Sequence, residues 1–278
     1  MPFSRRQLLQ AIAAGSILGA FPAKVVKAQN TPPPPLIVDG HLDLGWNMVN
    51  YGRDYSLRAE TIRQSEGRTI AGEAMLGLPN LFEGGVGLLF GVIFTMPQRY
   101  TTVPHRAVYT NAQEAYAWGQ QMLMAIKAFA DSQERVRFVQ DTATLDAVLA
   151  TWQDNVPDDE RLLGIILAME GADPILSPDT LSEWVEQGLR CIGPAWASTR
   201  YAGGTNGGDA ELTGAGRALL AEMAQYNLLL DTAHLTESVF WQALLHWDGP
   251  IVYSHGNSRH FLPDDRGLSD NQIDALVE

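Results

Sequence analysis

The chain has 278 residues, of which 46% are hydrophobic and 18% are charged, and this suits one large globular domain with a full core. The formal net charge of −13, with only three lysines, excludes a strongly basic surface, so neither nucleic acid nor an anionic membrane is an expected partner. The single cysteine, Cys191, excludes an internal disulfide and a cysteine-rich zinc site.

The first 28 residues have the pattern of an export signal. Arg5 and Arg6 precede an apolar run over residues 11–21, and small residues around Ala28 offer a cleavage point. The run is shorter than the roughly 20 apolar residues of a membrane-spanning helix. It resembles a twin-arginine signal peptide, although an ordinary secretory signal or an uncleaved anchor stays open. We expect residues 1–28 to direct a bacterial-type protein to the periplasm, without stable membrane insertion after cleavage.

A proline-rich linker is expected at residues 29–35, and a barrel domain at 36–278. The domain opens with an apolar run that ends in Gly40, His41 and Asp43. Two residues apart, the His and Asp side chains point the same way from a strand. Imidazole and carboxylate groups both bind zinc-like ions, and barrels place their chemistry at strand carboxyl ends. The pair alone is a weak signal of a metal site, because the Asp can instead cap a turn and the His can be hydrogen-bonded within the wall of the barrel.

The rest of the chain alternates between strand-like and helix-like segments. Residues 46–83 predict a long loop with short helices over the mouth of the site. Further strands are expected at 84–94, 162–171, 189–196, 228–234 and 250–255, and helices at 111–130, 143–152, 180–187, 214–226, 236–247 and from 269 onward. This alternation predicts a parallel α/β fold, and the polar side chains that end several of the strands favour a barrel with its site at that face.

Four of the six strands end in side chains that bind metals. Glu170 directly ends a buried apolar run, where an ionised carboxylate is costly unless a cation meets it. His234 and His255 end two later strands. With Glu170 as a bridge, the residues divide into His41, Asp43 and Glu170 on one metal and Glu170, His234 and His255 on the other. Two cations that share a water would activate it as a nucleophile and polarise a carbonyl. Because Glu170 would bridge the two cations, it is the candidate catalytic carboxylate.

These motifs resemble the membrane (renal) dipeptidase family of zinc metallopeptidases. The resemblance rests on Asp39–Asp43, Glu170–Gly171, Leu230–His234 and Ser254–Arg259 in this order, and covers nearly all of residues 36–278. It implies two Zn²⁺ ions held by the five residues above, and hydrolysis of the peptide bond of a dipeptide by a hydroxide that bridges both metals. It also implies that Arg266 holds the substrate carboxylate, and it admits a homodimer.

Two features depart from the family pattern. Trp196 stands where the family commonly has a His that helps to stabilise the oxyanion, and its indole can donate only one hydrogen bond. This puts the substrate range in question and makes Trp196 a substrate-binding candidate. The resemblance also implies a TIM-barrel-like (β/α)8 metal-dependent hydrolase of which about six of eight units are present, because the family barrel has eight strands, the last of which provides a metal-binding Asp. Because only six strands are expected here, we expect the sequence to be a fragment of a longer product.

Two other functions stay open. One is a truncated, non-catalytic protein that binds peptide or metal. The other is an amidohydrolase of the lactonase or phosphotriesterase type, which shares the barrel. Such sites usually begin with His-x-His and often use a carbamylated lysine, whereas Asp43 replaces the second His and Lys127 lies within a predicted helix. The metal is also open, because His and carboxylate ligands suit several divalent ions.

Overall fold

The computed structural model describes residues 36–67, 72–153, 155–205 and 210–277. The signal peptide predicted for residues 1–28 and the linker predicted for residues 29–35 lie outside this part of the chain and stay predictions.

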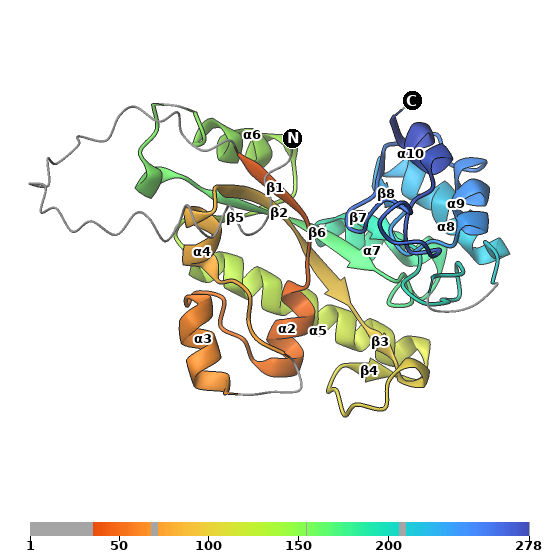
Figure 1. Cartoon of the computed structure of the whole chain (residues 1–278), viewed down its shortest axis with the longest axis horizontal. Coiled ribbons are helices and arrows are strands. Elements are labelled where there is room, and N and C mark those ends of the chain that lie inside the picture. The colour runs from red at the N-terminus through yellow and green to blue at the C-terminus, as the bar shows by residue number, and fades with distance from the viewer. Residues whose placement is uncertain (1–35, 68–71, 154, 206–209, 278) are drawn as a thin grey trace, which may run out of the picture. The chain divides into compact units, whose positions relative to one another are not determined.

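A curled parallel sheet of seven strands runs through the domain (Figure 1). Its strands are β1 (Ile37–Leu42), β2 (Val86–Phe94), β5 (Val136–Val139), β6 (Leu163–Glu170), β7 (Leu189–Gly193), β8 (Leu229–Asp231) and β9 (Ile251–Val252). They pair in the order β1-β2-β6-β7-β8-β9, and β5 pairs with β6. A separate pair joins β3 (Met96–Pro97) to β4 (Val108–Tyr109). The predicted parallel α/β class is confirmed.

One strand of this sheet was missing from the sequence-based expectation. β5 pairs with residues 163–166 of β6, and β7 pairs with β6 from Leu167 onward, so the two strands follow one another along the same side of β6. β5 has only four residues, so its hydrophobic signal is short between its neighbouring helices, although three of the four are apolar. The six expected strands are all present in the sheet, and β5 is a seventh that the sequence analysis did not predict.

Helices occupy most connections between the strands. They are α2 (Leu44–Tyr51), α3 (Ala59–Glu66), α4 (Leu78–Glu83), α5 (Ala112–Ser132), α6 (Thr142–Ala150), α7 (Leu181–Glu186), α8 (Gly214–Gln225), α9 (Glu237–Leu244) and α10 (Asp270–Val277). Several begin at a side-chain cap, as where Asn111 Oδ1 accepts a hydrogen bond from Glu114 N at 3.0 Å. None of the helices in the described ranges has the length and apolar character required to cross a bilayer.

Strand β6 lies at the centre of the hydrophobic core. Leu163, Ile165 and Leu167 are fully buried, and so are Met122 and Ile126 of α5, which packs against β2 and α2. A parallel strand covered on both faces reads as a continuous apolar run, as this one does. The run delivers Glu170 to the carboxyl end of the most deeply buried strand, at the edge where parallel strands bring their last residues together.

Candidate metal centre

The five predicted metal ligands come together at the carboxyl edge of the sheet. His41 lies in β1, Asp43 directly precedes α2, Glu170 ends β6, and His234 and His255 follow β8 and β9. Glu170 Oε1 lies 3.0 Å from His234 Nε2 and 3.3 Å from His255 Nε2. Glu170 Oε2 lies 3.7 Å from His41 Nε2, which is 3.5 Å from Asp43 Oδ1.

The two oxygens of Glu170 therefore face two different groups of ligands. Glu170, His234 and His255 offer ligand atoms within 4.8 Å of one another, and so do His41, Asp43 and Glu170. These are the two groups that the sequence analysis assigned to two metals. A carboxylate placed between two such groups can bridge two cations.

The environment of these atoms fits divalent cations. Glu170 Oε1 and Asp43 Oδ1 are buried and lack a hydrogen bond of good geometry among the described residues, although two imidazoles lie close to the Glu170 atom. A buried carboxylate oxygen without a partner is unfavourable. His234 Nε2 and His255 Nε2 are also only 3.0 Å apart, a distance that requires a proton or a cation between their lone pairs. Nitrogen and carboxylate donors of this kind suit zinc, among other ions.

The pKa shifts of His234 and Glu170 agree with this donor set. Burial is the largest influence on His234 and lowers its pKa, which favours the neutral imidazole that binds metals. Burial also disfavours the charged form of Glu170, but the nearby His234 and His255 nitrogens and the charge of His41 outweigh it and hold the pKa of this carboxyl well below its usual range. At His41 burial is again opposed, by Asp43 and Glu170, and the pKa is raised.

Two backbone features bring the imidazoles close together. A Cβ on Gly40 would lie 2.6 Å from the carbonyl oxygen of Ser254, so glycine is required where the chain after β9 meets β1. This approach places the His41 and His255 ring centroids 3.8 Å apart. His234 has a φ of +65°, a conformation that costs energy in a non-glycine residue and recurs at functional sites.

The predicted strand ends differ from the observed ones. β7 ends at Gly193 rather than Trp196, β8 at Asp231 rather than His234, and β9 at Val252 rather than His255. The two imidazoles and the indole are therefore carried by the loops that follow the strands. The expected edge of the sheet was right, but the positions of these side chains depend on loop conformation that strand propensity does not encode.

Trp196 belongs to an aromatic wall beside the ligands, formed by Trp46, Phe94, Tyr100 and Trp196. The Trp196 ring centroid lies 5.2 Å from Phe94, 6.1 Å from Tyr100 and 6.2 Å from His234. Trp46 lies 5.1 Å from Phe94 on the far side. The wall joins β2, α2 and the loop after β7, and sequence reasoning found only Trp196 of its four members.

Arg266 lies close to the same centre. Its guanidinium donates hydrogen bonds to the hydroxyl of Tyr253 at 3.0 Å and to the carbonyl of His255 at 2.9 Å. Its positive charge also helps to lower the pKa of His234. The structure thus places Arg266 beside a predicted ligand, with two of its N–H groups used within the protein.

Asp231 and Ser254 had no role in the sequence analysis, although both lie in its motifs. Asp231 offers an oxygen within 4.8 Å of ligand atoms of His41 and His255, which makes a third candidate group. Ser254 Oγ lies 2.6 Å from Asp231 Oδ2 and 2.8 Å from His255 Nδ1. The signal in the sequence was their place near candidate ligands, because Ser254 directly precedes His255 and Asp231 lies three residues before His234.

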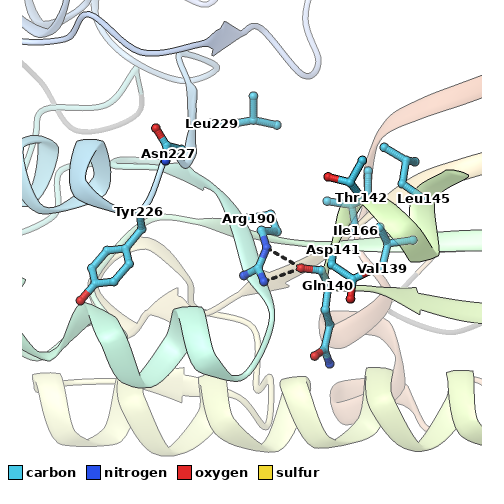
Figure 2. A pocket seen from close by; sticks show the side chains of 10 residues that line it. All are labelled: Val139, Gln140, Asp141, Thr142, Leu145, Ile166, Arg190, Tyr226, Asn227 and Leu229. Atoms are coloured by element: carbon cyan, nitrogen blue, oxygen red, sulfur yellow. Dashed lines mark hydrogen bonds between the residues drawn. The ribbon is translucent and has the colours of Figure 1, made fainter.

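A separate cavity of about 350 Å³ lies where β5 ends and β7 begins (Figure 2). None of the five predicted ligands lines it. Its charged residue Arg190 donates two hydrogen bonds, of 3.1 and 2.6 Å, to the backbone carbonyl of Gln140. Asp141, also in its wall, caps α6 by accepting from Thr144 N at 2.7 Å. These polar groups serve the fold, and the metal centre is elsewhere.

The fold and the position of the ligand cluster define the class of TIM-barrel-like metal-dependent hydrolases. Residues 31–278 match the family model described as membrane dipeptidase (peptidase family M19), and the chain belongs to this family.

Two solved structures of metallopeptidases have similar folds. A metallo peptidase from Rhodobacter sphaeroides, liganded with a phosphinate mimic of the dipeptide L-Ala-D-Ala, is 24% identical, with a TM-score of 0.67 over 87% of this chain and 70% of that chain. The dipeptidase AC, a metallo peptidase, is 25% identical, with a TM-score of 0.67 over 87% and 69%.

A curated relative is the uncharacterised protein in the PQQ-III 3′ region of Acinetobacter calcoaceticus. It is 35% identical over 128 residues, which are 43% of this chain and 41% of that protein. The match covers less than half the length of this relative. The activity of the whole protein is therefore stated below as a proposal.

Proposed function

We propose that the chain is a zinc-dependent dipeptidase that uses two metal ions and a water activated between them. The observation that carries the proposal is the position of Glu170, whose two carboxylate oxygens face separate groups of His and Asp ligands. Membership of the membrane dipeptidase family supports the class of reaction.

The residues around the cluster support binding of a small peptide. Divalent ions bound here would polarise the scissile carbonyl and lower the pKa of a coordinated water. The neutral imidazole of His234 and the ionised Glu170 carboxylate are the forms that hold such ions. Arg266 brings a fixed positive charge beside His255. A guanidinium has five N–H groups, more than its two contacts here use, and it suits the terminal carboxylate of a dipeptide.

The proposal is tested by peptide hydrolysis with defined metal content. The chain is stripped with a chelator, reloaded with Zn²⁺, and assayed against L-Ala-D-Ala, L-Ala-L-Ala and the N-acetylated forms. We expect hydrolysis of a free dipeptide that requires added metal. Zinc binding without turnover of any dipeptide would contradict the proposal and identify a non-catalytic binding protein.

We expect the aromatic wall to favour dipeptides with a large apolar side chain. Replacing Trp196 by Ala removes the ring of the wall whose centroid lies 6.2 Å from that of His234, and aromatic contacts contribute roughly 0.5–1.5 kcal/mol beyond area burial. KM for an aromatic dipeptide should therefore rise by roughly two- to tenfold, while Gly-Gly changes little. Trp241→Ala, on α9 and 37% exposed, is the control. Equal losses for both substrates in Trp196→Ala would show that the wall does not select side chains.

A further inference from the structure

We propose that Asp231 and Ser254 act as positioning residues for His255, through a relay of two hydrogen bonds from Asp231 to Ser254 to His255. The inference rests on the proposed function, because the relay would orient a side chain that binds metal. It goes further by assigning a role to two residues that are not in the predicted ligand set.

The relay fixes which nitrogen of His255 carries the proton. Ser254 Oγ lies 2.6 Å from Asp231 Oδ2, and a carboxylate oxygen can only accept there, so the serine donates its single proton to Asp231. The serine oxygen is then free to accept from His255 Nδ1 at 2.8 Å. With the proton on Nδ1, the lone pair is on Nε2, which faces Glu170 Oε1 at 3.3 Å. Partners of this kind orient metal-binding imidazoles.

The carboxylate of Asp231 is itself held rigidly. Its Oδ1 accepts hydrogen bonds from Ala233 N at 3.0 Å and Ser254 N at 3.1 Å, and the residue is 6% exposed. These bonds attach it to the loops that carry His234 and His255. The buried Asp231 carboxylate therefore holds the backbone of both loops, and through Ser254 it also orients the His255 ring.

The competing role for Asp231 is direct coordination, because it also lies within ligand distance of His41 and His255. Both of its oxygens, however, already accept hydrogen bonds: two at Oδ1 and the short one from Ser254 at Oδ2. Coordination would compete with the serine for Oδ2. The observed contacts therefore favour positioning over coordination.

Zinc affinity, measured by competition with a chromophoric chelator, separates the two roles. We expect Ser254→Ala to weaken binding by about 10- to 100-fold, the usual effect of removing such a partner, and Ser254→Thr to restore it by retaining the hydroxyl. Direct coordination by Asp231 predicts instead that Asp231→Asn loses zinc while Ser254→Ala binds it normally, which would overturn the proposal. Thr232→Val is the matched control, because its hydroxyl also joins β8 to β9, by donating to Val252 O at 3.1 Å.

A second measurement tests the relay without metal. Nitrogen chemical shifts of the His255 ring in the folded, metal-free chain should report a proton on Nδ1, whether or not Nε2 also carries one toward Glu170, and Ser254→Ala should lower the occupancy of Nδ1. A His255 ring whose Nδ1 carries no proton in the unaltered chain would overturn the proposal. Failure of the unaltered chain to bind zinc would contradict the proposed function alone, because the ring shifts still decide the relay.

Discussion

Glutamine in place of Glu170 should abolish the metal centre. The amide keeps the size of the side chain, but it has no charge and only one acceptor oxygen, so it cannot face two cations as the two carboxylate oxygens do. We expect zinc content to fall from two ions per chain to less than one. Because the Lewis-acid contribution is several kcal/mol, dipeptide hydrolysis should fall by at least about a thousandfold.

The zinc content of Glu170→Gln is measured on folded protein, beside Glu134→Gln as the control. Glu134 is exposed and lies away from the ligands, just before β5. Circular dichroism shows whether Glu170→Gln is folded, which we expect because the substitution removes a buried charge. An unchanged zinc content in folded Glu170→Gln would refute the bridging role.

Glu66→Gln should cause a large loss of stability. Arg53 and Glu66 form a buried, two-pronged ion pair, with Nε–Oε1 at 2.8 Å and Nη2–Oε2 at 3.2 Å, and side chains only 6% and 13% exposed. Arg53 also donates to Asn47 Oδ1 at 2.7 Å, which connects α3 to α2. Neutralising Glu66 leaves the guanidinium charge buried without its partner. We expect the free energy of unfolding in urea to fall by about 3 kcal/mol.

An exposed pair of similar geometry is the control for this experiment. Arg58 donates to Glu83 at 2.5 and 2.7 Å, but the two side chains are 46% and 58% exposed. Solvent screens such a pair, so Glu83→Gln should change the unfolding free energy far less than Glu66→Gln. Equal changes in the two variants would show that burial does not strengthen the inner pair.

The sequence was most informative where a long apolar run ended in a charged residue. Seven of the eight residues of strand β6 are buried, and its hydrophobicity and the costly carboxylate at its end were both visible without coordinates. Alternation of strands and helices was sufficient to place His41, His234 and His255 at one edge. Their role as ligands stays a prediction that the proximity of their ring nitrogens supports.

The features that escaped prediction depend on contacts between distant segments. The aromatic wall joins Trp46 of α2 to Phe94 of β2 and Trp196 of a later loop, and no local pattern encodes such a meeting. The link between Asp231 and Ser254 requires the register of β8 against β9, with Asp231 opposite Val252. Strand β5, with only four residues, was too short to be distinguished from a connection.

A single titration can show whether the chain holds a two-metal site that hydrolyses dipeptides. Zinc is added in steps to the metal-free chain, and bound zinc and hydrolysis of L-Ala-D-Ala are measured in the same samples. We predict that binding saturates at two ions per chain and that hydrolysis rises until the second ion is bound. Saturation at one ion or none, or hydrolysis that persists in the metal-free chain, would contradict this account.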